Sequence, residues 1–300
     1  MRMQVDRMDV RGVRHRACRV EKSPCQRTYY TKKGVQYRRR QRTHFPSSPT
    51  PPGLGHQVTV DWRRMVIDTS FDFRTDAGGK DPDVYSPRLR QYHKLRWNKP
   101  LPSGRLFDLH DTVRGAYLHH RSQDGKEYFL SSDSVIPTFT RWGFAKAHPE
   151  LYTEEENEAF MTISYTIGGM MVFPANWIQG KWTINQARGC LRRISDRFDL
   201  TVECIQRHYA RQSSPLGETL ARYDDFFALF EDFSGYVDFF LLQDLVTDDR
   251  AAVTFFMPFD DFRTPSAPED DAMYREYRRR SIEFIEAQNR RIERHAAEGP

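Results

Sequence analysis

The 300-residue chain is 38% hydrophobic and 13% aromatic, which supplies a well-filled core and excludes a chain that is disordered throughout. Residues 1–64 hold 16 Lys and Arg against 4 Asp and Glu (net +12), which leaves 30 against 37 for residues 65–300 (net −7). The overall charge of +5 therefore comes from the first 64 residues, and the remainder is acidic.

Cysteine spacing and apolar runs exclude further classes of protein. The four cysteines form no CxxC pair and have no histidine at zinc-ligand spacing, so neither a disulfide framework nor a zinc knuckle is expected. The uncharged run 159–180 is long enough to span a membrane but too polar, and it predicts half-buried strand with a turn or bulge at Gly168-Gly169. With no apolar run of signal-peptide type near the N-terminus, we expect a soluble cytoplasmic protein.

Residues 1–64 are expected to be disordered, because "YRRRQRTHFPSSPTPPGLGH" joins a basic run to a Pro, Ser and Gly linker. One interpretation is a nucleic-acid-binding arm. The other is a translation start placed too early, with Met65 opening the folded protein at "MVIDTSFDF". The change of charge and composition at Met65 favours the second. Residues 65–300 are then one domain.

The first half of this domain predicts one helix and a meander. Ser86 as N-cap and Pro87 at the first helical position predict a helix over 87–97. Further on, Asp124-Gly125 lies between two strand-like runs, as a two-residue hairpin turn requires. A preceding strand at "RLFDLHD" completes three antiparallel strands, and "TEEENEAF" starts a short helix before uncharged strands at 161–174.

The second half is dominated by helical periodicity. The predicted helices span 185–195, 199–210, 215–230, 233–246 and about 270–295, with a short buried strand at 251–259. We therefore predict an α+β fold, with an antiparallel sheet or meander in the first half and a mainly helical second half that contains a late short strand.

Several long phrases carry a family resemblance. "DTSFDF", "SPRLRQYHKLRWNKPLPSG", "FLSSDSVIPTFTRW", "INQARGCLRRISDRFDLTVECIQRHY" and "FSGYVDFFLLQDLV" together resemble an uncharacterised bacterial protein family catalogued as a domain of unknown function. The resemblance covers about residues 67–292. It implies no assigned activity, so it supplies neither a catalytic residue nor a cofactor.

The segment 173–189, "FPANWIQGKWTINQARG", is the first candidate site. A strand end, a loop and a helix N-terminus are recurring ingredients of anion sites, and we expect Asn176, Lys181, Asn185 and Arg188 to bind a phosphorylated ligand there. The structural alternative is that Thr183 or Asn185 caps the helix and Arg188 pairs with Asp196 or Asp199. No nucleotide-binding loop motif is present.

Histidines in the meander form a weaker candidate, for a metal. If strand 106–111 pairs with 115–120 about a tight connection at 112–114, Asp108, His110 and His120 share one sheet face. Imidazole and carboxylate suit zinc, manganese or iron. A one-residue slip of register would separate them. Exposed strand histidines are the favoured alternative, so no metal is predicted.

The helix from Arg88 to Lys99 is a third candidate, because its positive charges alternate with aromatic rings. This pattern suits RNA, single-stranded DNA or a nucleotide. The candidate ligand-binding residues are Arg88, Arg90, His93 and Arg96. The alternative is a solvated helix that pairs with acids elsewhere.

Two classes of function follow. The first is a binder or enzyme of a phosphorylated ligand, nucleotide or short nucleic acid, with the 88–99 helix as a second wall of the site. The second is a non-enzymatic interaction protein, regulatory or defence-associated, that meets its partner through the aromatic residues of 223–262. In "SSDS", Asp133 is a candidate base or ligand, or else it caps a turn. The sequence identifies no cofactor.

Overall fold

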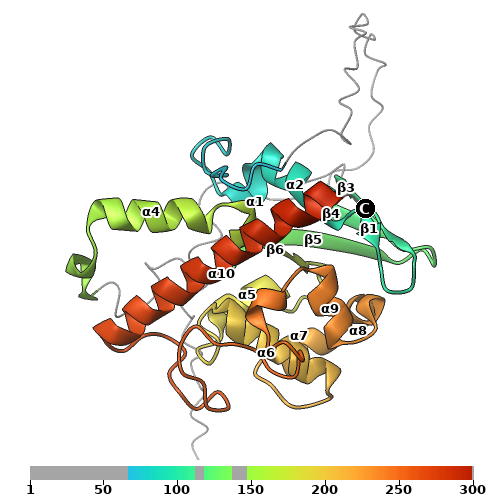
Figure 1. The fold of residues 1–300 in the computed structure, drawn as a ribbon. Coiled ribbons are helices and arrows are strands. Elements are labelled where there is room, and N and C mark those ends of the chain that lie inside the picture. The colour runs from blue at the N-terminus through green and yellow to red at the C-terminus, as the bar shows by residue number, and fades with distance from the viewer. Residues whose placement is uncertain (1–66, 112–117, 137–146, 299–300) are drawn as a thin grey trace, which may run out of the picture. The chain divides into compact units, whose positions relative to one another are not determined.

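A computed structural model describes residues 67–111, 118–136 and 147–298 (Figure 1). The expectations for residues 1–64 and for the 112–114 connection lie outside the described residues. The α-helices are α1 (Pro82–Tyr85), α2 (Pro87–Trp97), α4 (Glu154–Ser164), α5 (Ile184–Cys190), α6 (Phe198–Tyr209), α7 (Gly217–Ala221), α8 (Asp224–Phe227), α9 (Phe233–Phe239) and α10 (Asp271–Glu298). The strands are β1 (Lys99–Pro100), β2 (Leu106–Phe107), β3 (Leu109–Asp111), β4 (Leu118–Arg121), β5 (Glu127–Ser134) and β6 (Met170–Pro174), and the 3-10 turns are η4 (Pro149–Leu151), η5 (Ile167–Gly169), η6 (Ala228–Phe230) and η7 (Gln243–Leu245).

The predicted meander is confirmed as an antiparallel sheet in the order β3-β4-β5-β6, while β1 and β2 form a separate pair. The hairpin between β4 and β5 forms where it was expected, but the two-residue turn is wrong: the Ser122 N–H donates to the Lys126 carbonyl at 2.9 Å, so the loop holds three residues. Of these, Gly125 has a φ of 82°, in the left-handed region that glycine favours. In β5, residues 127–130 pair with β4, and residues 130–134 pair with β6. The second half of β5 therefore has a strand neighbour on one side, and α1 packs against it.

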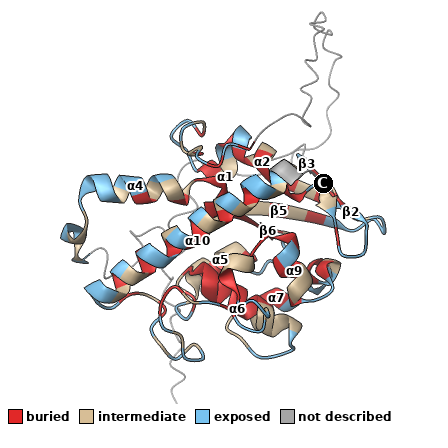
Figure 2. Ribbon diagram, viewed as in Figure 1, coloured by how far each residue is buried: buried red, intermediate tan, exposed pale blue. Residues whose placement is uncertain are grey.

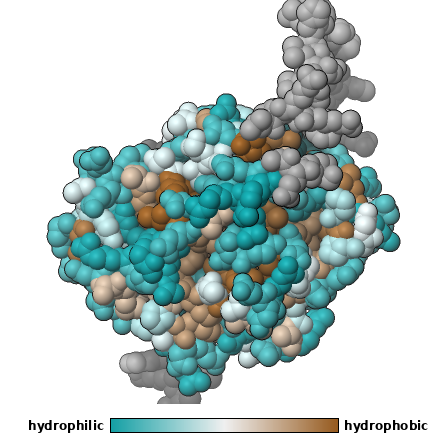
Figure 3. Space-filling view, in the orientation of Figure 1, coloured by the Kyte–Doolittle hydropathy of each residue, from teal (hydrophilic) through white to brown (hydrophobic). Residues whose placement is uncertain are grey.

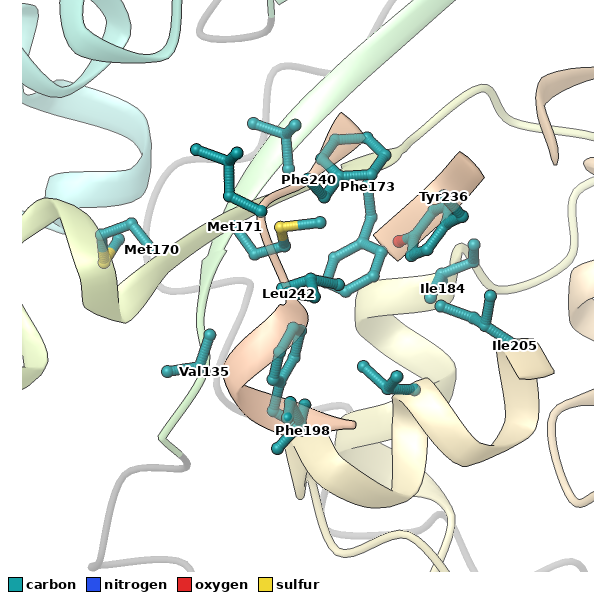
Figure 4. Close-up of a cluster of buried hydrophobic side chains, with 14 of the residues drawn as sticks. Val135, Met170, Met171, Phe173, Ile184, Phe198, Ile205, Tyr236, Phe240 and Leu242 are labelled. Atoms are coloured by element: carbon teal, nitrogen blue, oxygen red, sulfur yellow. The ribbon is translucent and has the colours of Figure 1, made fainter. Parts of the chain in front are cut away.

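The helical second half is confirmed and encloses the core. All five residues of β6 are buried, so the sheet is covered on both faces at this strand. Figure 4 shows Met171 and Phe173 of β6 meeting Phe198 of α6 and Tyr236 of α9. Burial in Figure 2 is almost continuous along α6, whereas α10 alternates between buried and exposed residues.

Gly168 allows α10 to cross close to η5, and Gly169 allows η5 to lie close to the end of α4 (Figure 1). A Cβ on Gly168 would lie 2.6 Å from the Ile285 carbonyl oxygen, and a Cβ on Gly169 would lie 2.2 Å from that of Ser164. The Gly168 N–H donates to Asn289 Oδ1 at 2.7 Å. Glycine is therefore required at both positions by space rather than by backbone conformation.

The helix 87–97 is confirmed with both of its bounds, and Ser86 Oγ accepts from the Leu89 N–H at 3.0 Å. The strand expected from 161 is wrong in its first part, because α4 continues to Ser164 and the strand begins at Met170. A capping box between Thr153 and Glu156 starts α4, and burial of Phe160 against the core holds its last turns.

Two long helices predicted in the second half are shorter in the structure. The span 215–230 divides into α7, α8 and η6, and the span 233–246 into α9 and η7. Leu241, at φ 57°, ends α9, and Glu231, at φ 66°, follows η6. The late strand is reduced to one antiparallel bridge between Val246 and Val253.

Most aromatic residues of 223–262 belong to the core, so they do not supply the exposed surface that the interaction alternative expects. The buried rings are those of Tyr223, Phe226, Phe227, Phe230, Phe233, Tyr236, Phe239, Phe240 and Phe256. Their centroids are commonly 5–6 Å apart, as between Phe230 and Tyr236 (5.5 Å). Among the described residues, no helix combines the length and apolarity needed to cross a membrane.

Candidate functional site

The contacts of Arg188 match the structural alternative for segment 173–189. Thr183 caps α5 in a capping box with Gln186. The fully buried Arg188 side chain donates to Asp133 Oδ2 at 2.9 Å and lies 3.4 Å from Asp196 Oδ1. Burial lowers the pKa of Arg188, but the charges of Asp196 and Asp133 outweigh this and raise it overall. Two carboxylates thus already balance this guanidinium.

The other predicted residues of the segment, Asn176, Asn185 and Lys181, make contacts that do not involve Arg188. Asn176 joins the loop to β5, because its amide accepts from the Phe129 N–H at 3.0 Å and donates to the Glu127 carbonyl at 2.8 Å. Asn185 Nδ2 donates to Ser131 Oγ at 2.8 Å. Lys181 is exposed to solvent.

The histidine arrangement expected for a metal is wrong in its register. His110 is opposite His119 in the sheet, and His120 is opposite Leu109, so His110 and His120 point to opposite faces. Asp108 Oδ2 lies 2.8 Å from His110 Nε2. The His120 ring instead lies against Phe107, with 4.2 Å between the ring centroids. Within the described ranges, no three His, Cys, Asp or Glu side chains are grouped to hold a metal ion.

The basic helix α2 does not present its charges on one surface. His93 is fully buried and Arg96 is 3% exposed. Arg96 stacks 4.1 Å above the Trp97 ring and donates to the Ile167 carbonyl at 2.8 Å, and burial lowers its pKa to about 9. The Arg88 guanidinium lies 3.8 Å above the Phe71 ring. Arg90 is half-buried.

The structure brings a different set of polar residues together at the second half of β5. We name this set the polar site: Asp83 of α1, His93 of α2, Ser132 and Asp133 of β5, and Arg188 of α5. Neighbouring residues of a strand point to opposite faces, so Ser132 meets His93 on one side while Asp133 meets Arg188 on the other. Asp83 links the two sides, because it interacts with both Ser132 and Asp133.

Ser132 and His93 form the central contact of the polar site. Ser132 Oγ lies 2.9 Å from His93 Nε2. The other ring nitrogen, Nδ1, is buried and has no hydrogen-bond partner. Burial, assisted by the charge of Arg96, keeps the pKa of His93 well below its usual range, so the ring is neutral at pH 7.

Asp83 is the most perturbed acid of the polar site. Its Oδ1 is shielded from solvent and has no hydrogen-bond partner. Burial, followed by repulsion from Asp133 and Asp81, holds the pKa of its carboxyl well above the usual range, while Ser132 and Arg188 oppose the shift. Asp133 is unlike it, because its side chain is 25% exposed and ion-paired to Arg188.

This arrangement places two neighbouring carboxyl groups in contrasting environments beside a hydroxyl that is bonded to an imidazole. Pairs of acids whose surroundings separate their protonation are a recurring feature of acid-base catalysis. Sequence inspection singled out His93, Asp133 and Arg188 separately. It missed Asp83, since "KDPDVY" signals only a helix cap by Asp81, which accepts from the Asp83 N–H at 3.1 Å.

Comparison with known proteins places the chain in a family. A family model described as a family of unknown function (DUF6994) matches residues 67–292, which include the whole polar site. No curated protein and no solved structure matches the chain. The resemblance seen in the sequence is thus confirmed over the same span. The chain belongs to DUF6994, a family of unknown function.

Proposed function

We propose that the protein is an enzyme that acts at the polar site on a small, uncharged polar substrate, with Asp83 and Asp133 as acid and base. The observation that carries this proposal is the contrast between the two carboxyl groups. Asp83 Oδ1 is buried without a hydrogen-bond partner, whereas Asp133 is partly exposed and paired with Arg188. A protonated carboxyl can donate a proton, and an ionised one can accept it.

The roles of the remaining residues follow from their contacts. Ser132 is partly exposed and bonded to the neutral His93, so its hydroxyl is oriented toward one side of β5. A hydroxyl held in this way positions a substrate or relays a proton to the imidazole. Arg188 is fully buried and pairs with both Asp133 and Asp196, which fixes the position of the Asp133 carboxylate.

The charge balance favours an uncharged substrate over a phosphorylated one. A phosphate at Arg188 would have to compete with the carboxylates of Asp133 and Asp196, which already approach its guanidinium. The negative charges of a phosphate and of these two carboxylates would repel each other, and more strongly in a buried site than in bulk water. A phosphorylated ligand or nucleotide therefore fits the surface around Lys181 better than the polar site.

The test is a thermal-shift screen of the full chain against two sets of compounds. One set holds uncharged sugars, polyols, amides and nucleosides, and the other holds their phosphorylated counterparts. We expect a compound of the first set to raise the Tm, and mass spectrometry of the incubated mixture to detect its product. Stabilisation only by phosphorylated compounds would contradict the proposal.

Two serines offer matched variants for the measurement of product formation. Ser132→Ala removes the hydroxyl that contacts His93, and Ser131→Ala removes the adjacent hydroxyl that contacts Asn185. Both delete one oxygen from the same strand. We expect turnover to fall at least about 100-fold in Ser132→Ala, within the usual range for acid-base groups, and little in Ser131→Ala. Equal effects would indicate a structural role only.

A further inference from the structure

Two tryptophans stand out on the surface of the loop 175–182, which we name the tryptophan loop. Trp177 is 67% exposed and Trp182 is 45% exposed, and both precede α5. Leaving a large aromatic side chain in water forgoes the favourable free energy of burying it. The face drawn in Figure 3 is mostly hydrophilic. Among the described residues, the exposed large hydrophobic side chains are those of Trp177, Trp182, Tyr85 and Leu106.

The exposure does not arise from a loosely held loop. The Asn176 side chain is bonded to the backbone of β5, and Tyr223 Oη donates to the Asn176 carbonyl at 2.9 Å. At the other end, Arg222 Nη2 donates to the Trp182 carbonyl at 2.6 Å. Between them, the Lys181 N–H donates to Ile178 at 3.1 Å, closing a turn. The rings are thus presented by a braced backbone, which lowers the entropy cost of binding.

The charges beside the rings are positive and uncompensated. Lys181, which is exposed, lies between the two tryptophans in sequence. In the described part of the chain, neither Lys181 nor Arg222 has a carboxylate within 4.0 Å, and Arg222 donates only to backbone carbonyls. The nearby Asp225 is already paired with Lys126 at 2.7 Å.

We propose that the tryptophan loop binds a short single-stranded nucleic acid, with bases stacked on Trp177 and Trp182 and phosphates beside Lys181 and Arg222. Aromatic rings combined with cations are the usual elements of single-strand binding. A protein partner fits less well, because lysine is depleted at the centres of protein interfaces. The net charge of −7 over residues 65–300 limits the footprint to a few nucleotides and makes binding sensitive to salt.

The test measures binding of a fluorescein-labelled oligouridylate of about six nucleotides to the full chain by anisotropy, with tryptophan quenching as a second readout. Each base stack contributes enough that Trp177→Ala and Trp182→Ala should each weaken binding about 10-fold or more. Lys181→Ala should lower the slope of log K against log salt by about 0.7. The basic residues 1–64 are common to all variants, so differences between variants report on the loop.

Tyr85 and Lys80 supply the matched control. Tyr85 is 49% exposed, and Lys80 Nζ lies 4.7 Å from its ring centroid, so this pair also combines an exposed ring with a cation. Tyr85→Ala and Lys80→Ala should bind as the wild type does. If the two tryptophan variants also bind like the wild type, with the same quenching, the proposal is overturned. The rings are exposed, so the Tm should confirm that all variants are folded.

Discussion

Ser132 Oγ and His93 Nε2 lie 2.9 Å apart, which joins β5 to α2 across 39 residues of chain. The contact fixes a neutral imidazole against a partly exposed hydroxyl at the strand half that α1 covers. Together with Asp83 and Asp133, it defines the polar site. The physical consequences of these buried groups can be measured before any substrate is known.

Asp83→Asn is expected to stabilise the protein at pH 7. Because burial and Asp133 raise the pKa of Asp83 in the folded state, the unfolded chain ionises first as the pH rises. Wild-type stability therefore falls as the pH rises from about 4 towards the folded pKa, by up to about 1.4 kcal/mol per pH unit. Asn cannot ionise, so the variant escapes this loss.

The check is thermal unfolding of wild type and Asp83→Asn between pH 4 and pH 8. The Tm difference should be near zero at pH 4 and grow with pH. A Tm difference that is the same at every pH would show that the carboxyl titrates normally in the folded protein.

His93→Gln is expected to change the acid limb of the stability profile. Burial depresses the pKa of His93, so the unfolded chain takes up a proton below pH 6.5 that the folded chain does not. Wild-type stability is then lost as the pH falls below 6.5, by about 1.4 kcal/mol per pH unit from this group. Gln keeps a donor for Ser132 but does not titrate.

Urea unfolding of wild type and His93→Gln at pH 5 and pH 7 separates this effect from the smaller ones of His120 and His208, which both proteins share. The variant should lose less stability between the two pH values. Parallel losses would mean that His93 is accessible to protons in the folded state.

The buried ion pair of Arg197 and Asp199 is expected to be essential for stability. Both side chains are almost fully buried, and Asp199 also accepts from the Phe256 N–H at 2.8 Å. Asp199→Ala leaves a buried guanidinium without its partner, which costs about 3–5 kcal/mol. Glu283→Ala breaks an exposed pair with Arg279 and should cost much less, because solvent screens exposed ion pairs. Urea unfolding measures the free energy of unfolding of both variants. Similar losses of stability would contradict the essential role of the buried pair.

Gly168→Ala tests the crossing of η5 and α10. Its methyl group would lie 2.6 Å from both Asn289 Oδ1 and the Ile285 carbonyl oxygen. One of the two segments must move, which costs about 1–3 kcal/mol. Gly217→Ala is the control, because its methyl group would meet only Ser214 Oγ at 3.8 Å. A Tm for Gly168→Ala that equals that of Gly217→Ala would contradict the close crossing.

Local signals predicted the parts of the fold that local chemistry decides. Ser86 and Pro87 set the start of α2, and Asp124-Gly125 marks the position of the hairpin, because capping and turn geometry depend on a few adjacent residues. The length of the hairpin loop, three residues instead of two, was not predicted. The strand register that places His110 and His120 is not determined by such local signals. Alternation permits either register, and a shift by one residue reverses the faces.

The polar site could not be assembled from sequence, because its members come from four segments joined by long-range packing. Arg188 lies 55 residues from Asp133, and His93 lies 39 residues from Ser132. The sequence pattern assigned His93 and Arg96 to a basic, ligand-binding surface of the helix, whereas in the structure both side chains are buried. The span 215–230 also divides into α7, α8 and η6 with its rings buried, because tertiary packing overrides helical propensity.

The most direct test of the central claim is the thermal-shift screen repeated on wild type, Ser132→Ala and Ser131→Ala. We predict that an uncharged polar compound stabilises wild type and Ser131→Ala by about 2.7 kcal/mol at 100 times its Kd, and that Ser132→Ala loses this response. If no uncharged compound shifts the Tm, or if the two serine variants respond alike, the polar site is a structural network and the proposed activity is wrong.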